Sequence, residues 1–109
     1  MQFRALTELR SLDDVQMCTM VLGNWHKLNT VLRCRPTVQD LQRLLVLELL
    51  SEARPDILRR LRAALSRAHG RVAELAMADV IDACVWGKKP KLETLLLIGL
   101  DRESAGRIV

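Results

Sequence analysis

The sequence contains no tyrosine and only three aromatic residues, so its apolar half consists mainly of Leu, Val, Ala, Ile and Met. Glycine is also sparse, and no stretch alternates apolar and polar residues between hairpin turns, as a β-strand would. Leu and Ala together with many Arg and Glu favour helices. The 109 residues therefore predict one all-α domain, 1–109, that is large enough to bury its own core.

Long hydrophobic runs are absent as well. The longest apolar segment, Leu95 to Leu100, has six residues, whereas a membrane-spanning helix needs about 20. Residues 1–4 do not begin a signal-peptide hydrophobic stretch. The cysteines form an odd and widely spaced set, Cys18, Cys34 and Cys84. We therefore expect a cytoplasmic protein with no membrane contact, whose thiols are reduced and act as small buried hydrophobes.

The sequence also lacks the patterns of a metal site or an enzyme. No two cysteines have the C-x-x-C spacing that zinc sites use. Two pairs of neighbouring acids occur, Asp13 with Asp14 and Asp79 with Asp82. Such pairs on helices are more often capping and solvated groups than ligands of a divalent ion. The only histidines, His26 and His69, are in no recognisable catalytic spacing, so we expect no catalytic residue, no metal and no cofactor.

All three prolines follow a basic residue and precede a polar and then an aliphatic residue. They lie in Arg35-Pro36-Thr37-Val38, Arg54-Pro55-Asp56-Ile57 and Lys89-Pro90-Lys91-Leu92. Proline fits the first turn of a helix and pushes the preceding residue out of the α region. Each proline therefore marks the start of a helix, which predicts a bundle of about five helices joined by short turns.

The helix signals also predict boundaries. The expected helices are 3–10, 12–33, 38–52, a helix from 55 that ends near 69 or continues past 75, 72–85, and 91–99, with one further turn in the tail 101–107. Ser11 and Asp14 resemble a capping box for helix 12–33, and Thr37 and Asp40 resemble one for helix 38–52. Gly87 is expected to end helix 72–85.

Helix 12–33 has the clearest periodicity. Its seam alternates spacings of three and four residues through Val15, Cys18, Leu22, Trp25, Asn29 and Leu32. Asn29 either fixes the register of a helical dimer or lies partly exposed near the helix end. Gly23 in mid-helix indicates close packing against another backbone.

Two segments carry more apolar surface than one buried stripe requires. Helix 38–52 is hydrophobic on nearly all sides, and 91–99 is almost entirely apolar. Such a helix is either central in the fold or covered by a second copy of the chain. The residues predicted to form an interface of this kind are Leu47, Leu50, Leu96 and Leu97.

The surplus positive charge lies in one segment. Residues 1–53 contain six basic and six acidic residues, and residues 72–109 contain five and six. Residues 54–71 contain one acid, Asp56, and six arginines, namely Arg54, Arg59, Arg60, Arg62, Arg67 and Arg71. The formal net charge of +4 therefore comes from one predicted helix.

The last five of these arginines are predicted to point away from the core. On a helical wheel, one flank holds Arg60, Arg67 and Arg71, the opposite flank holds Arg62, and the outer face holds Arg59. Because arginine binds phosphate with two hydrogen bonds, a short turn before this helix is compatible with helix-turn-helix presentation to DNA. The alternative is an ordinary helical hairpin whose arginines are solvated or face an acidic protein.

Two stretches around the first two prolines, RPTVQDLQRLL (35–45) and RPDILRRL (54–61), carry a resemblance. Within residues 35–72 the chain resembles small helical accessory proteins of tailed bacteriophages, which often have a Leu-rich helix, a turn and an Arg-rich helix. The resemblance implies a small intracellular protein that is a regulator or binds a host factor.

Two functions remain open from the sequence. The first is a non-enzymatic nucleic-acid-binding regulator, expected to be a dimer, that uses the six arginines of 54–71. The second is a helical protein-interaction module, such as an adaptor, inhibitor or assembly subunit, whose contact face is the apolar surplus of 44–50 or 92–100. Both predict a homo-oligomer or a protein partner, and only the first predicts binding that weakens steeply with salt.

Overall fold

A computed structural model describes residues 2–67 and 72–109, and every regular element within them is helical. The α-helices are α1 (Gln2–Ser11), α2 (Asp14–Met17), α3 (Trp25–Arg33), α4 (Val38–Leu50), α5 (Pro55–Leu65), α6 (Val72–Val85), α7 (Leu92–Leu97) and α8 (Arg102–Ile108). A π-helical turn, η1 (Cys18–Leu22), continues α2. The all-α prediction is confirmed, but the expected count of about five helices is too low for the described residues.

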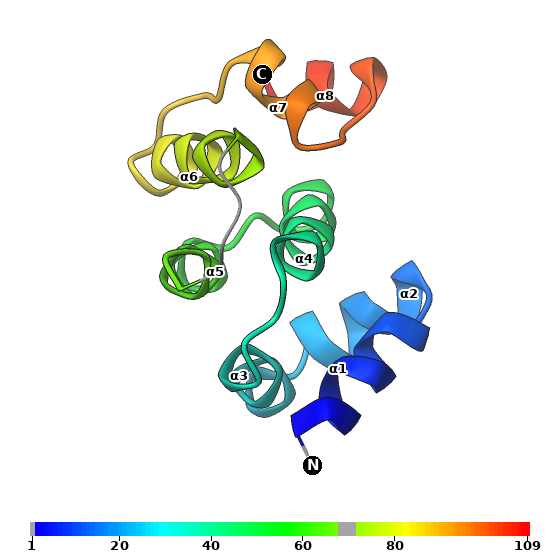
Figure 1. Ribbon diagram of the computed structural model, residues 1–109. Coiled ribbons are helices and arrows are strands. Elements are labelled where there is room, and N and C mark those ends of the chain that lie inside the picture. Colours follow the sequence, from blue (N-terminus) through cyan, green and yellow to red (C-terminus); the bar gives the residue numbers. More distant parts are fainter. Residues whose placement is uncertain (1, 68–71) are drawn as a thin grey trace.

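The helices are stacked along the long axis of the molecule in sequence order. α1, α2 and α3 lie at one end, α4 and α5 lie in the middle, α6 follows, and α7 and α8 lie at the other end (Figure 1). The extents are 38 × 27 × 22 Å and the radius of gyration is 13.0 Å, which is the size expected of a globular chain of this length.

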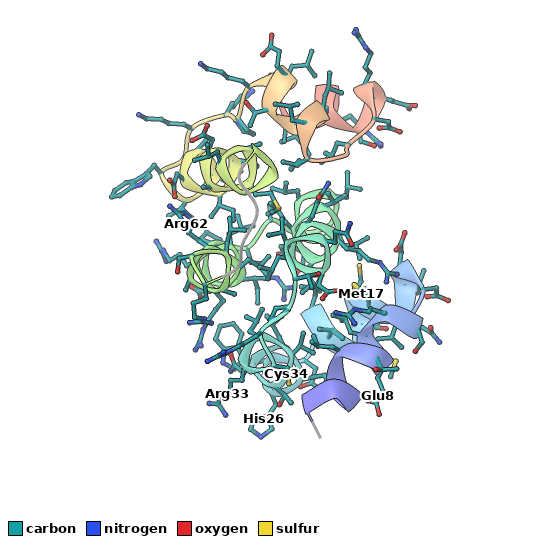
Figure 2. The ribbon with its side chains drawn as sticks, viewed as in Figure 1. Glu8, Met17, His26, Arg33, Cys34 and Arg62 are labelled. Atoms are coloured by element: carbon teal, nitrogen blue, oxygen red, sulfur yellow. The ribbon has the colours of Figure 1, made fainter. Side chains whose placement is uncertain are left out.

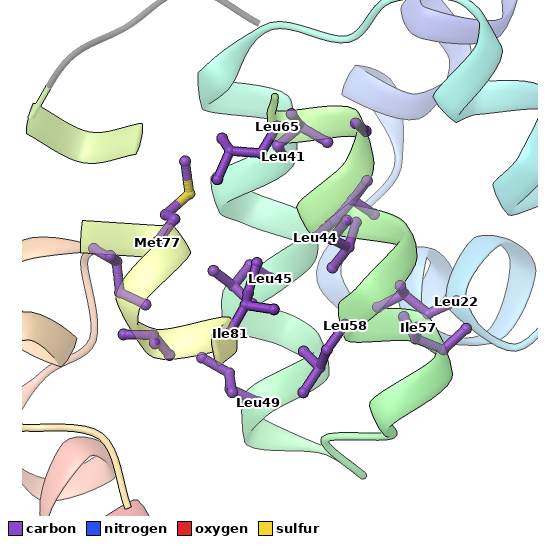
Figure 3. Packing of buried hydrophobic residues seen from close by; sticks show 14 of the residues in the cluster. Leu22, Leu41, Leu44, Leu45, Leu49, Ile57, Leu58, Leu65, Met77 and Ile81 are labelled. Atoms are coloured by element: carbon purple, nitrogen blue, oxygen red, sulfur yellow. The ribbon is translucent and has the colours of Figure 1, made fainter. Parts of the chain in front are cut away.

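The α4–α5 pair forms the centre of the core. Their facing side chains are almost completely buried, and α6 covers them from a second direction (Figure 3). The contributing residues include Leu41, Leu44, Leu45, Leu58, Leu65, Met77 and Ile81. Because each such side chain contributes about 1.5–3 kcal/mol when buried, this layer is a main source of stability. The wide apolar surface of α4 is thus explained in large part by its central position.

The prediction of one helix over residues 12–33 is wrong. The chain breaks at Gly23 and Asn24, where the Asn24 side chain accepts a hydrogen bond from the Lys27 N–H at 3.1 Å and begins α3. An Asn side chain can use this cap only at a helix start, so it competes with continuation of the helix. The predicted seam is therefore not one buried face, since Val15 is 74% exposed and Trp25 is 45% exposed.

The predicted capping box of Ser11 and Asp14 is also wrong. The N-cap is Asp13, whose side chain accepts from the Gln16 N–H at 2.8 Å while the Gln16 side chain accepts from the Asp13 N–H at 3.0 Å. Ser11 remains in α1 because its hydroxyl donates to the Glu8 carbonyl at 2.7 Å. The box therefore forms two residues later than the sequence pattern predicts.

Several other boundaries match the sequence pattern. α5 begins at Pro55 as predicted and ends at Leu65, while positions 68–71, on which its longer alternatives depend, lie outside the described residues. α6 spans the predicted 72–85, and Gly87 adopts a positive φ of 72° after it. α7 is shorter than 91–99 because Gly99, with φ of 107°, turns the chain toward α8.

The predicted capping box of Thr37 and Asp40 is confirmed, and Arg10 of α1 joins it. The Arg10 guanidinium donates to both oxygens of Asp40, from Nε at 3.1 Å and from Nη2 at 2.8 Å. Burial would raise the pKa of Asp40, but hydrogen bonds from Arg10 and Thr37 outweigh it, so this pKa lies below its ordinary value of 3.8. The buried carboxylate thus holds α1 against the start of α4.

The turn between α4 and α5 is closed by a second, deeper charge pair. Glu48 is completely buried, and its carboxylate accepts from Arg54 three times, from the backbone N–H at 2.8 Å, Nε at 3.0 Å and Nη2 at 2.9 Å. Arg54 Nη2 also donates to the Leu22 carbonyl at 3.0 Å. Hydrogen bonding to Glu48 raises the pKa of Arg54. One arginine therefore joins α4, α5 and the end of η1.

Substituting the two members of this pair is expected to have unequal effects. Arg54→Met should lower the free energy of unfolding by about 3–5 kcal/mol, because it leaves a buried carboxylate without a countercharge. Glu48→Gln should lower the free energy of unfolding by less, about 2 kcal/mol, because Arg54 can still interact with solvent and with Glu52. Urea denaturation measures both. The double variant Glu48→Gln/Arg54→Met should be less destabilised than the sum of these two single variants, and simple additivity would contradict the assignment.

Acid should weaken the contact between α1 and α4. Since the folded-state pKa of Asp40 is below 3.8, its stabilisation is fully present above that pH and is lost as pH falls through the folded-state value. Asp40→Asn should therefore lower stability near neutral pH and reduce its decline between about pH 5 and pH 2. Thermal unfolding followed by circular dichroism across this range tests the expectation. An Asp40→Asn profile parallel to that of the unmodified chain would contradict it.

Candidate nucleic-acid interface

The sequence of α5 places its arginines outside the core. The helix buries Ile57, Leu58, Leu61, Ala64 and Leu65. These positions follow helical spacing on one side, so the intervening arginines point outward. Arg59, Arg60 and Arg67 are exposed, and Arg62 is half-buried. Arg71, the sixth predicted contact, lies outside the described residues.

Arg54 has a structural environment that differs from the others. Its guanidinium is occupied by Glu48, by Glu52 with Nε and Oε2 3.0 Å apart, and by the Leu22 carbonyl. Releasing it toward a phosphate would leave the buried Glu48 carboxylate unpaired, which is strongly unfavourable. We therefore leave Arg54 out of the contact set that the sequence suggested.

Two arginines have acidic neighbours at long distance. Arg59 Nη1 lies 3.5 Å from Asp56 Oδ1, and Arg62 Nε lies 3.5 Å from Asp82 Oδ1 of α6. Figure 2 shows Arg62 between α5 and α6. All four side chains reach solvent, and such pairs contribute at most about 1 kcal/mol. A phosphate could therefore replace either carboxylate at small cost.

Arg60 has an aromatic partner instead of an acid. Its Cζ lies 4.7 Å from the centroid of the Trp25 ring, at the start of α3. Within residues 2–67 and 72–109, Arg60 forms no ion pair. Stacking holds the guanidinium plane by its face and leaves N–H donors at its edge. Trp25 and Arg60 also border an open hollow with Asp56, Arg59 and Ala63.

Trp25 is the residue that sequence reasoning missed. Its place on the apolar seam of 12–33 predicted a buried ring, because the seam assumed an unbroken helix. The signal for exposure is the pair Gly23-Asn24, in which Asn24 is a strong N-cap residue immediately before Trp25. Because the chain breaks just before it, Trp25 is the first residue of α3. Its ring is exposed at this position and can contact other groups.

The predicted interface leucines differ in exposure. Leu50 and Leu97 are 48% and 63% exposed, whereas Leu47 and Leu96 are half-buried. Leu47 borders a hollow with Val46, Ile98 and Gly99. The structure thus brings α4 to the end of α7 at Leu47, where the Gln42 side chain also donates to the Ile98 carbonyl.

Three further sequence predictions concern metal sites, membrane-spanning helices and the cysteines. No group of three or more His, Cys, Asp or Glu side chains among the described residues could hold a metal ion. In that part of the chain no helix has both the length and the apolar character needed to cross a bilayer. The cysteines are unpaired and only partly buried, not fully buried as expected, and burial raises the pKa of Cys18 and Cys84.

Comparison of the chain with protein-family models, with curated proteins and with solved structures found no match. Function is therefore inferred from geometry and charge alone. The arrangement best suited to a ligand on α5 is an arginine held by an indole, flanked by exposed Arg59 and Arg67. Such a surface can bind phosphate or carboxylate groups.

Proposed function

We propose that this protein is a non-enzymatic nucleic-acid-binding regulator that contacts phosphates through α5. The observation that carries the proposal is Arg60, which is stacked on Trp25 and has no acidic partner in the described part of the chain. A guanidinium whose plane is already fixed loses less side-chain freedom when a phosphate accepts two of its N–H groups. Arg60 is therefore held where it can bind an oxyanion, and no ion pair among the described residues neutralises its charge.

Two neighbours extend the positive surface. Arg59 lies beside Arg60 at the same hollow. Its acidic partner among the described residues is the exposed Asp56, at 3.5 Å. Arg67 follows Arg60 by seven residues and is exposed without an ion pair among the described residues. Nucleic acid fits this surface better than an acidic protein, because every phosphate of a duplex is charged and several arginines can be used at once.

Removing the two arginines that lack acidic partners should weaken duplex binding. We expect Arg60→Gln/Arg67→Gln to raise the Kd for a DNA duplex at least about tenfold and to flatten the slope of log K against log salt by about 1.8, the value for two lost phosphate contacts. Fluorescence anisotropy with a labelled duplex between about 50 and 200 mM salt measures both quantities.

The matched control removes two charges elsewhere. Arg102 and Arg107 are exposed on α8, which lies at the other end of the molecule from α3 and well away from α5 (Figure 1). Arg102→Gln/Arg107→Gln changes the net charge equally and should keep the Kd within about twofold, since only non-specific attraction is reduced. Equal behaviour of the two double variants would exclude α5 as the contact surface.

A second candidate function is a protein-interaction module that associates with a second copy of itself. Two observations favour it: Leu50 and Leu97 expose 48% and 63% of their surface, and Leu47 borders a hollow that is lined by Val46 and Ile98 as well as by polar residues. Association through these leucines would bury apolar area and would depend little on salt. It is compatible with nucleic-acid binding, because α5 is not part of this surface.

Light scattering tests the self-association. We expect a mass of twice the 12.4 kDa chain at micromolar concentration, at low and at high salt. Leu50→Glu/Leu97→Glu should shift the mass to the monomer, because a charge in an apolar contact is costly. Val15→Glu is the control, since Val15 is 74% exposed on α2. A monomeric unmodified chain at every concentration would exclude this candidate.

A further inference from the structure

The connection between α6 and α7 carries an exposed tryptophan, Trp86, followed in the sequence by three exposed lysines. Trp86 is 78% exposed, the highest value among the large hydrophobic side chains of the described residues. Lys88, Lys89 and Lys91 are exposed and form no ion pair within residues 2–67 and 72–109. A lone exposed apolar side chain is common on protein surfaces, but here the indole shares a short loop with three exposed lysines, the combination of groups that binds single strands.

The backbone of this connection is held at both ends. The Lys88 N–H donates to the Ala83 carbonyl at 2.8 Å and the Gly87 N–H to the Cys84 carbonyl at 3.2 Å, the two bonds of a Schellman motif. Gly87 supplies the positive φ of 72° that the motif requires. Pro90 is buried, and Lys91 immediately precedes α7. Little backbone entropy would therefore be lost when a ligand binds here.

The three lysines of this loop converge on one hollow. Lys88, Lys89 and Lys91 line one hollow of about 420 Å³, which Asp79 also borders. Trp86 follows Asp82 by four residues, so the two share a face at the end of α6. Asp82 in turn meets Arg62 of α5 at 3.5 Å. Through Asp82, the face of α6 that carries Trp86 meets Arg62 of α5.

We infer that residues 86–91 bind an unpaired segment of nucleic acid, with Trp86 stacked on a base and the lysines against the backbone phosphates. Aromatic stacking platforms beside positive grooves are how single strands are held without sequence preference. The strand must be unpaired at this point, because the base faces inside a duplex are covered by their neighbours. This inference rests on the proposed function for the class of ligand but assigns a different surface.

An anionic membrane is the competing ligand for an indole with lysines. Asp79 and Asp82 are exposed on the same α6 face as Trp86 and would face the negative headgroups. A single strand meets less of this repulsion, because its base contacts the uncharged indole and its phosphates lie over three lysines that outnumber the bordering Asp79 carboxylate. The geometry therefore favours a strand over a lipid surface.

The first test removes the indole. Trp86→Ala should raise the Kd for a labelled oligothymidylate of about 15 nucleotides by about tenfold or more and leave the Kd for a duplex within about twofold. Val15→Ala is the control, because it also removes an exposed apolar side chain and lies on α2. Trp86→Ala should unfold at the same temperature as the unmodified chain, since the ring is mostly exposed.

The second test removes two loop charges. Lys88→Gln/Lys89→Gln should flatten the salt slope for the oligothymidylate by about 1.4, the value for two phosphate contacts of a single strand. Arg102→Gln/Arg107→Gln removes the same charge from α8 and should leave that slope unchanged. Equal slopes for the loop variant and the unmodified chain would overturn the assignment of the lysines.

The outcomes separate this inference from the proposed function. If Arg60→Gln/Arg67→Gln loses duplex binding while Trp86→Ala binds oligothymidylate normally, the loop inference is overturned and the role of α5 stands. If only Trp86→Ala loses binding, the loop inference stands and the role of α5 fails. Failure of the unmodified chain to bind oligothymidylate, alone or together with Trp86-dependent binding to phosphatidylserine vesicles, would also overturn the inference.

Discussion

The fold depends on a carboxylate that has no access to water. Glu48 is stable at its buried position only because Arg54 supplies both a backbone and a guanidinium donor, and this requirement fixes how α5 leaves α4. The same guanidinium holds the Leu22 carbonyl, so the end of η1 is fixed relative to α5. α3 follows η1 after a two-residue break. The position of Trp25 beneath Arg60 is therefore set by a charge pair that touches neither residue.

Arginines have two distinct roles in this chain, and the burial of the partner separates them. Arg10 and Arg54 meet carboxylates that are nearly or completely inaccessible, so their charges are committed to holding helices together. Arg59 and Arg62 meet exposed carboxylates at 3.5 Å, where water screens the attraction. A count of charge along the sequence treats these groups alike. The structure shows that the first group cannot serve an external anion without loss of stability.

Sequence patterns predicted the elements that are specified within about one helical turn. The box of Thr37 and Asp40 and the start of α5 at Pro55 are of this kind, because the deciding atoms lie three or four residues apart. The break at Gly23-Asn24 was missed because an apolar repeat that spans the break outweighed a local capping signal. The pairs Glu48–Arg54 and Arg60–Trp25 depend on how helices pack. Arg60 and Trp25 are far apart in the sequence, so no local pattern predicts their contact. For the same reason the charge surplus identified α5 but not its aromatic partner.

The exposure of both tryptophans follows from the composition of the core. Leucines of α4 and α5 fill the central layer, so the fold has no need of an indole there. Trp25 and Trp86 are instead 45% and 78% exposed; Trp25 contacts Arg60, and Trp86 shares its loop with the lysines of 88–91. Exposed apolar area of this size is unfavourable by about 25 cal/mol per Å². Arg60 covers part of the Trp25 ring, and a bound ligand would remove more of the exposed indole area from water. The two tryptophans therefore distinguish the two surfaces for which we propose ligands, which the net charge alone does not single out.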